Sequence, residues 1–279
     1  MSKLKILLLG GRGLLGSATL KHISDAYDIY TCDRRPGGKK HLVGDVTDEA
    51  FCKAHLKAFE VIINFVGLSP LRRPSETSYR EVHVWGVRNI LFFMKSDARF
   101  IHISAFGSEN PGESEYLASK KRAEELILSS NCSYAIIRPN LILSESSELI
   151  SSLRKYKFLR LFPDIPTRVR PVMLDSVASL VASYIPNKKK VIVNVDGHRE
   201  LTMGSLMSDY LASINYAPLM IPFVVVWPFF ILACYLRLFG LSLEQLILLS
   251  SNPQAKDSKS EYIFRNGFDE FLKEVTDYK

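Results

Sequence analysis

The first 140 residues alternate short apolar runs with longer stretches in which apolar positions recur every three or four residues. The apolar runs predict strands and the amphipathic stretches predict helices. Strands are expected at residues 5–10, 28–32, around 43, 61–67, 99–104 and 133–139, and helices at 13–24, 79–94 and 115–130. Because strands that are apolar on both faces form parallel sheets covered by helices, this order predicts an α/β fold with a doubly wound parallel sheet.

Beyond Pro139 the regular alternation of strand-like and helix-like segments ends. Residues 147–162 predict a basic amphipathic helix, residues 188–195 predict one more strand that rejoins the main sheet, and the remainder is mostly helical. We therefore predict a Rossmann core at residues 1–140, with residues 172–199 rejoining it. Residues 141–171 and 200–279 are expected to form a smaller, mainly helical C-terminal lobe, the position from which such folds build the substrate side of the cleft.

One segment does not fit an ordinary lobe, because residues 210–236 carry no charge and 219–236 are apolar or proline throughout. That length is sufficient for a membrane helix. Three prolines argue against a straight span, and the flanking aromatic and basic residues suit an interface. We favour a proline-broken cover over the substrate site, or a peripheral membrane contact through residues 210–241, over a true span. The residues behind this interpretation are Pro218, Pro222, Pro228, Trp227, Tyr235 and Arg237.

The amino-acid composition excludes several classes of protein. Hydrophobic residues make up 47% and charged residues 23%, which is typical of a globular chain and not of a disordered one. The four cysteines lie far apart and no Cys/His cluster exists, so we expect neither a metal site nor a disulfide framework. The simplest compartment is the cytoplasm, with membrane association as the alternative. The apolar run at the start is too short for a signal peptide.

The net charge of +7 is unevenly distributed, because residues 117–171 hold ten Lys/Arg against five Asp/Glu. Such a basic stretch fits an anionic substrate or an acidic membrane, or is simply a solvated surface. Nucleic acid is not expected as a partner, because no recognition motif accompanies the charge. A small-molecule substrate is expected, and the sequence leaves the oligomeric state open.

The first candidate chemistry is a glycine loop between the first strand and the first helix. Gly10, Gly13 and Gly16 give the spacing that allows a tight turn, close approach of backbone to a pyrophosphate, and close packing of helix on strand. The backbone N–H groups of Leu14 and Leu15 open the helix, where a phosphate is stabilised. We predict that this loop binds NAD or NADP.

The choice between the two cofactors depends on the end of the second strand. Asp33 is placed to accept hydrogen bonds from the adenosine ribose of NAD, whereas Arg34 and Arg35 can pair with the 2′-phosphate of NADP. The two signals conflict, and Asp33 favours NAD slightly.

The second candidate is the pair Tyr116 and Lys120. Four residues make about one helical turn, so the phenol and the ammonium share a helix face. A nearby cation is expected to lower the pKa of the phenol and make it a proton donor or acceptor near neutral pH.

Together these motifs resemble the short-chain dehydrogenase/reductases, in the extended or atypical branch that includes epimerase/dehydratase-like members. The resemblance covers roughly residues 4–200. Three motifs, VHVWGVRNI, RFIHISAFGS and LSLEQLILLSSNP, look closest to the group that contains the short-chain-dehydrogenase-like accessory subunit of respiratory complex I and its bacterial relatives.

The resemblance implies a role for further residues. Asp45 and Val46 would lie near the adenine, and Val66 and Gly67 would line the cofactor. Tyr116 and Lys120 would transfer the proton, with Lys120 also holding the nicotinamide ribose. Pro139 would lie in the segment that passes the nicotinamide, and Arg168 resembles the arginine that grips the diphosphate of a sugar nucleotide.

The chain also departs from the family pattern. The fifth strand ends in Ser104 and Ala105, which puts Ala105 where the family has its catalytic Ser or Thr. Because side chains alternate along a strand, a hydroxyl one position early points away unless the strand end bends. Ser104, with Ser108 as a second choice, is nevertheless the candidate hydroxyl. The helix asparagine of the family is His83 here, and its Gly-Pro after the sixth strand is replaced by Leu143-Ser144-Glu145.

Two functions from different classes follow. The first is an NAD(P)-dependent oxidoreductase or epimerase acting on a nucleotide sugar or a lipid-like alcohol or ketone, with Tyr116 and Lys120 transferring the proton and Ser104 assisting. The alternative is a largely non-catalytic subunit that holds NAD(P)H and docks on a membrane complex such as respiratory complex I; Ala105 and the uncharged segment favour it. A redox-sensing regulator ranks last, because such proteins commonly lack the Tyr/Lys pair.

Overall fold

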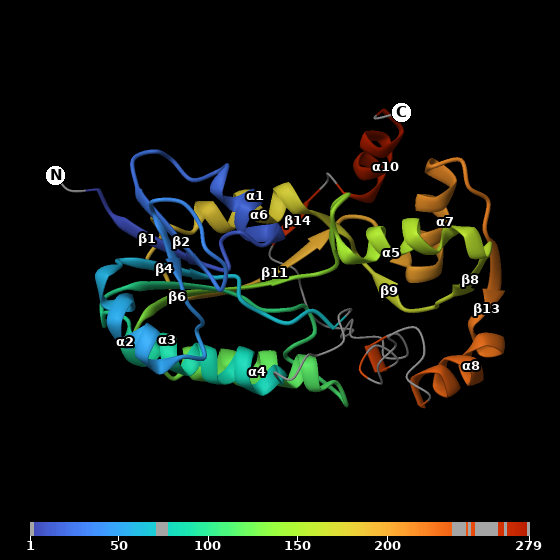
Figure 1. The fold of residues 1–279 in the computed structure, drawn as a ribbon. Coiled ribbons are helices and arrows are strands. Elements are labelled where there is room, and N and C mark those ends of the chain that lie inside the picture. The colour runs from blue at the N-terminus through green and yellow to red at the C-terminus, as the bar shows by residue number, and fades with distance from the viewer. Residues whose placement is uncertain are drawn as a thin grey trace.

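The computed structural model describes residues 3–70, 78–235, 244, 247–248, 262–264 and 267–277. An eight-stranded sheet forms its centre, in the order β14-β11-β6-β5-β4-β1-β2-β3, and every neighbouring pair is parallel (Figure 1). The strands are β1 (Lys5–Leu9), β2 (Asp28–Asp33), β3 (His41–Val43), β4 (Val61–Asn64), β5 (Arg99–Ile103), β6 (Ser133–Pro139), β11 (Val191–Gly197) and β14 (Tyr262–Phe264).

Helices cover both faces of this sheet, which confirms the predicted doubly wound Rossmann fold. On one face, α2 (Glu49–His55), α3 (Gly86–Phe93) and α4 (Glu115–Leu128) pack on a core that includes Leu7, Phe100 and Ile136. On the other face, α1 (Leu14–Leu20) and α6 (Leu174–Ser183) lie side by side on Ile6, Ile63 and Ile101 (Figure 1). Successive strand residues therefore enter opposite cores, which explains why these strands are apolar throughout.

The smaller lobe has its own apolar core, made by α5 (Glu148–Tyr156), α7 (Met203–Ser213) and α10 (Phe268–Asp277). Three two-stranded ladders complete it. They pair β7 (Ile142–Leu143) with β10 (Val172–Met173), β9 (Arg168–Val169) with β12 (Leu201–Thr202), and β8 (Leu161–Asp164) with β13 (Leu219–Pro222). Leu206, Tyr210 and Phe271 are fully buried at its centre.

The structure refines three sequence-based expectations. The helix expected at 147–162 ends with α5 and a short 3₁₀ turn (Lys157–Leu159), and its last residues form β8 instead. The strand expected at 188–195 is β11, which begins at Val191 and joins the main sheet, as predicted, by pairing with β6. Residues 262–264, which the sequence assigned to the lobe, extend the central sheet as β14 because they pair with residues 195–197.

The long apolar segment is divided between two elements. Residues 219–222 form β13, and residues 223–235 form helix α8 (Phe223–Tyr235), which contains Pro228. None of the helices in the described part of the chain is long and apolar enough to cross a membrane. The end of the proposed contact, residues 236–241, and most of LSLEQLILLSSNP lie outside the described residues.

Candidate functional site

The glycine loop turns sharply between β1 and α1. Gly10 has a φ of +73°, and a Cβ there would lie 3.2 Å from the backbone of Phe65 and Val66, so the position requires glycine. A Cβ on Gly16 would come within 2.6 Å of the Gly10 carbonyl oxygen, because α1 packs directly against the loop. A Cβ on Gly13 would meet only that same carbonyl oxygen, at 3.1 Å. Because Gly13 has no side chain, nothing at this position covers the first turn of α1.

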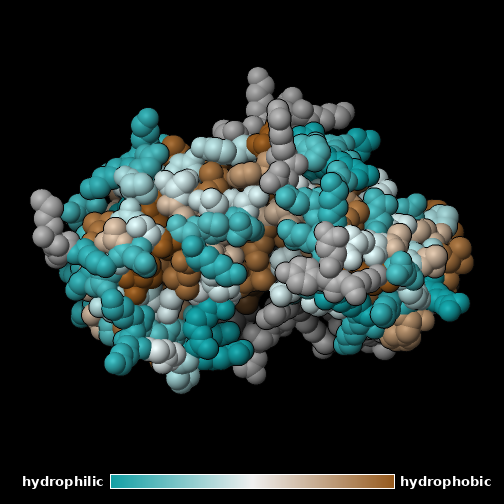
Figure 2. Space-filling view, turned by 90° about the horizontal axis from the view of Figure 1, so that it is seen from above, coloured by the Kyte–Doolittle hydropathy of each residue, from teal (hydrophilic) through white to brown (hydrophobic). Residues whose placement is uncertain are grey.

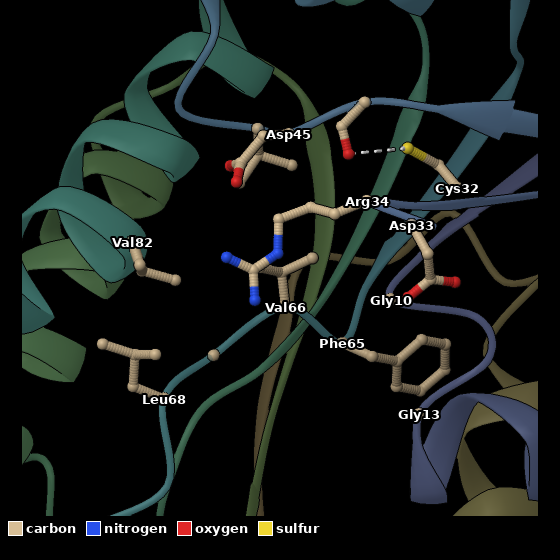
Figure 3. Close-up of a pocket in the computed structure, with 13 residues that line it drawn as sticks. Gly10, Gly13, Cys32, Asp33, Arg34, Asp45, Phe65, Val66, Leu68 and Val82 are labelled. Carbon is tan, nitrogen blue, oxygen red and sulfur yellow. Dashed lines mark hydrogen bonds between the residues drawn. The ribbon is translucent and has the colours of Figure 1, made fainter. Parts of the chain in front are cut away.

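A cavity of about 250 Å³ opens beside this loop at the carboxyl ends of β1, β2 and β4 (Figure 3). Ligands of open parallel sheets bind at this edge. Most of the predicted cofactor residues meet in the cavity wall. Those that are not part of it are Leu14, Leu15, Gly16, Tyr116, Lys120 and Pro139. The residues that line it are Gly10, Gly13, Cys32, Asp33, Arg34, Gly44, Asp45, Val46, Phe65, Val66, Gly67, Leu68 and Val82.

Asp33 and Arg34 occupy the same cavity with opposite charges. The backbone N–H of Arg12 donates to Asp33 Oδ2 over 3.1 Å, which fixes the carboxylate beside the glycine loop. The Arg34 side chain extends into the middle of the cavity, between Asp45 and Val66 (Figure 3). The conflict between the two cofactor signals in the sequence is thus also present in the folded structure.

Asp45 and Val46 form the opposite wall of the cavity, and local bonds hold them there. Asp45 Oδ1 accepts from the backbone N–H and the hydroxyl of Thr47, both over 2.9 Å. The side chain of Asn89, on α3, donates to the Val46 carbonyl oxygen over 3.1 Å. These contacts place the Gly44-Asp45-Val46 turn independently of any ligand.

Helix α4 carries Tyr116 and Lys120, and Lys120 reaches the end of β5. Ser114 caps this helix by accepting from the Leu117 N–H. Lys120 is buried, and its Nζ donates to the Ile103 carbonyl oxygen over 3.0 Å. Burial lowers the pKa of Lys120 to about 8, and the nearby Glu124 carboxylate opposes that change. Its ammonium group is therefore held in place at the sheet edge.

The predicted lowering of the Tyr116 pKa is wrong for this structure. Burial raises the pKa of Tyr116, and Tyr79 and Glu244 add to the increase. The rings of Tyr79 and His83 both lie 5.7 Å from the Tyr116 ring, so two aromatic rings pack against the phenol. A phenol in this environment stays protonated at neutral pH, which makes it a proton donor.

His83 is a functional candidate that the sequence indicated only through a missing asparagine. Its Nε2 accepts from the Leu68 N–H over 2.9 Å, and its Nδ1 lies 2.7 Å from Ser119 Oγ, which donates to the Tyr116 carbonyl oxygen. Burial lowers the pKa of His83 to about 2, and Lys120 contributes to the decrease. The neutral ring thus connects the cavity wall to α4.

Gly67 joins the cavity to the Tyr116–Lys120 pair. A Cβ on Gly67 would lie 3.2 Å from Lys120 Nζ and 3.3 Å from His83 Nε2. The backbone of this residue therefore runs between the cavity and the buried polar groups of α4. The arrangement would allow one extended ligand to contact both regions.

Glu244 is a residue of the site that the sequence did not single out. Its carboxylate accepts from the Ser114 hydroxyl, from the Glu115 N–H over 3.1 Å and from the Tyr116 N–H over 3.3 Å. A carboxylate is stabilised at the first turn of a helix by the N–H groups that have no partner within the helix. Ser114 and Glu244 are about 130 positions apart in the sequence, so the contact is visible only in the folded structure.

The Ser104 hydroxyl is already engaged with a residue of α4. Ser104 is buried, and its Oγ donates to Glu124 Oε1, which also accepts from Ser108 Oγ and Arg138 Nε. Ser104 and Ser108 therefore satisfy a buried carboxylate one turn beyond Lys120. The two serine hydroxyls therefore make structural contacts with Glu124. Ala105, at the expected catalytic position, has no hydroxyl.

Two other predicted residues lie outside the cavity wall. Pro139 ends β6, and its carbonyl oxygen accepts from the Phe106 N–H over 3.1 Å. Arg168 lies on β9 and is largely exposed, and its guanidinium donates to Glu200 over 2.7 Å. A carboxylate thus already neutralises the charge expected to grip a diphosphate. Among the described residues no group of His, Cys, Asp and Glu could hold a metal ion.

Solved structures share this fold. The chain superposes on dTDP-4-dehydrorhamnose reductase from Bacillus anthracis str. Ames, solved in complex with NADP, with a TM-score of 0.69, 15% identity and 100% of both chains covered. For UDP-glucose 4-epimerase of Thermus thermophilus, in complex with NAD, the TM-score is 0.63 at 16% identity, over 78% of this chain and 86% of the other.

A third similar structure is the thiolation-reductase di-domain of an archaeal non-ribosomal peptide synthetase. It gives a TM-score of 0.72 at 16% identity and covers 100% of this chain and 75% of the other. No curated protein sequence matches the chain. At these low identities the structural likeness establishes the fold alone.

The family is established by sequence. The model of one family matches residues 6–147, slightly more than half of the chain. The match spans the glycine loop, the cavity wall and the Tyr116–Lys120 helix described above. The chain therefore belongs to the NAD dependent epimerase/dehydratase family.

Proposed function

We propose that this protein is a dinucleotide-dependent reductase that converts a carbonyl to an alcohol. The observation that carries the proposal is the position of Tyr116 and Lys120 on one face of α4, joined through Gly67 to the cavity beside the glycine loop. A dinucleotide fits this arrangement, because Gly13 leaves the first turn of α1 bare and Asp33 lines the adjoining cavity. Its nicotinamide would supply hydride to the substrate carbon.

In this proposal each residue has a separate task. The Tyr116 hydroxyl donates its proton to the carbonyl oxygen, so that the addition of hydride and proton gives a neutral alcohol and the oxidised cofactor. A raised pKa keeps that proton in place at neutral pH. Lys120, fixed by the Ile103 carbonyl, provides a positive charge that would favour the phenolate formed after transfer. His83 keeps the turn of α4 that bears Tyr116 against the cavity wall.

Replacing Tyr116 with phenylalanine is the direct test. We expect turnover to fall by about 10²- to 10⁴-fold, the usual contribution of a positioned proton donor, with cofactor affinity nearly unchanged. The measurement is NADH or NADPH oxidation, followed by absorbance, with a panel of ketones and aldehydes that includes lipid-like and sugar-nucleotide members. Tyr134→Phe, on β6, is the matched control. Activity that survives in Tyr116→Phe would contradict the assigned role.

A second candidate is a subunit that holds NAD(P)H without turnover, as in the group around the complex I accessory subunit. The contact of Ser104 with Glu124, together with Ala105 at the expected catalytic place, favours it. The same substrate panel separates the two functions. Tightly held cofactor that no carbonyl compound oxidises would support the subunit, whereas oxidation sensitive to Tyr116→Phe supports the reductase.

We also propose that the cofactor is NAD rather than NADP. The Asp33 carboxylate lines the cavity where the adenosine ribose would lie, and it would repel a 2′-phosphate. Replacing Asp33 with alanine is expected to weaken NADH binding by about 10- to 100-fold, the effect of losing hydrogen bonds to a charged group, and to spare NADPH. Fluorescence titration with both cofactors measures this change. Arg34→Ala is the counterpart. Weaker NADPH binding in that variant, together with unchanged NADH binding in Asp33→Ala, would reverse the assignment.

A further inference from the structure

The outer edge of the small lobe exposes large apolar side chains from four neighbouring elements. We call this the apolar edge and define it as Phe158, Leu161, Leu219, Val224, Val225 and Phe229, each more than half exposed. Figure 2 shows hydrophobic residues gathered at the end of the molecule that the lobe forms. Single exposed apolar side chains are ordinary on a protein surface, but a continuous group of this kind marks a contact surface.

The β8–β13 ladder brings these residues together. Leu161 pairs with Leu219 in register, and the Leu219 N–H donates to the Arg160 carbonyl oxygen over 2.8 Å. Helix α8 starts directly after β13 and contacts both strands. Segments about 60 positions apart in the sequence therefore form one surface, at the right of Figure 1.

The inner side of the same elements is already occupied. Met220 and Phe223 pack against the buried core of the lobe, and the ring of Trp227 lies 5.1 Å from that of Phe223. Val224, Val225 and Phe229 point to solvent instead. A cover over a substrate site would bury such residues, so their exposure favours the second interpretation of this segment, a peripheral contact.

Basic residues lie next to the apolar edge. Lys157 and Arg160 flank Phe158 in sequence, and both are exposed. Neither forms an ion pair with any residue in the described part of the chain, whereas Arg154 of the preceding helix pairs with Glu145. No acidic residue occurs between positions 210 and 236. The surface thus combines apolar side chains with two cations that form no ion pair among the described residues, a combination complementary to an anionic membrane interface.

We infer that the apolar edge binds peripherally to the surface of a membrane that contains anionic lipids. The apolar side chains of α8 and β13 enter the boundary between headgroups and acyl chains, while Lys157 and Arg160 remain among the headgroups. Helix α8 has 13 residues and includes Pro228, so it lies in the interface and does not span the bilayer. The inference is independent of the proposed reductase activity.

Co-sedimentation of the full chain with vesicles tests the inference. We expect binding to vesicles of phosphatidylcholine mixed with phosphatidylglycerol, at least tenfold weaker binding to phosphatidylcholine alone, and weakening by high salt. The double variant Val224→Ser, Phe229→Ser is expected to lose most of the binding. Lys157→Gln is expected to weaken it about fivefold, which corresponds to about 1 kcal/mol per cation near an anionic surface.

The control is Phe92→Ser, which removes an equally exposed aromatic side chain from α3, on the Rossmann core. Circular dichroism and NADH titration verify that each variant is folded. Equal binding of wild type and the double variant to the mixed vesicles, or no binding of either, would overturn the inference. So would dimers in gel filtration that the double variant abolishes, because the apolar edge would then be an interface between two copies of the chain.

Discussion

Replacing Gly13 with aspartate is expected to eliminate measurable dinucleotide binding while the protein remains folded. The added carboxylate would stand at the bare first turn of α1, where the proposed pyrophosphate would be stabilised by N–H groups. Two like charges cannot share this position, so we expect NADH affinity to fall by more than about 100-fold, equivalent to about 3 kcal/mol. Fluorescence titration with NADH and NADPH measures the loss.

The chain offers a matched control for this substitution. Gly38 is an exposed loop glycine, and a Cβ there would meet nothing within 4 Å. Gly38→Asp adds the same charge outside the glycine loop and should keep both the fold and the affinity. If Gly13→Asp binds NADH like wild type, the glycine loop does not hold the phosphates and the proposed function fails with it.

The central sheet could be predicted from the sequence because its strands are buried on both faces. Residues of β1 alternate between the two cores, so Ile6 to Leu9 are all apolar, and the same is true of Val61 to Ile63 in β4. A run of this kind reads as a strand without knowledge of its neighbours. The glycine loop is equally local, and it lies between β1 and α1 as the spacing of its glycines predicts.

The lobe was predicted less well because its strands depend on distant partners. Leu161 and Phe162 continue the helical pattern of residues 147–162 in sequence, and Leu161–Asp164 become a strand by pairing with Leu219–Pro222. Tyr262–Phe264 stand in a charged tail and are held by β11. Short segments of this kind have little intrinsic preference, and the tertiary partner decides their conformation. The spacing of apolar residues along the chain does not indicate which distant strand such a segment pairs with.

For the candidate site, the sequence identified backbone positions better than side-chain contacts. The alternation argument predicted only that the Ser104 hydroxyl points away, whereas in the structure it donates to Glu124 on α4, a partner on another element that the sequence did not indicate. The pKa of Tyr116 moves opposite to the prediction because burial dominates it and the neighbouring Tyr79 and Glu244 raise it further. Glu244 was missed because a contact over such a sequence distance leaves no local signal.

Two buried histidines, His83 at the site and His102 on β5, lead to the second large effect, a loss of stability in mild acid. Burial lowers the pKa of His83 from 6.5 to about 2, and it holds the pKa of His102 well below 6.5. Below pH 6.5 the unfolded chain binds a proton at each position while the folded chain does not. Unfolding therefore takes up protons, and the free energy of unfolding falls by about 1.4 kcal/mol per histidine for each pH unit.

Between pH 6.5 and 4.5 the two histidines together should cost about 5 kcal/mol, a large part of the stability of a typical domain. Urea unfolding of the cofactor-free protein, followed at several pH values, measures the slope. His83→Asn keeps an acceptor for the Leu68 N–H and removes one titrating group, so we expect its stability to decline about half as steeply. His198→Asn, at an exposed position, is the matched control. A slope that is the same in His83→Asn and in wild type would mean that His83 becomes protonated within the folded protein. The bond from the Leu68 N–H to Nε2, which needs the neutral ring, would then have to break without loss of the fold.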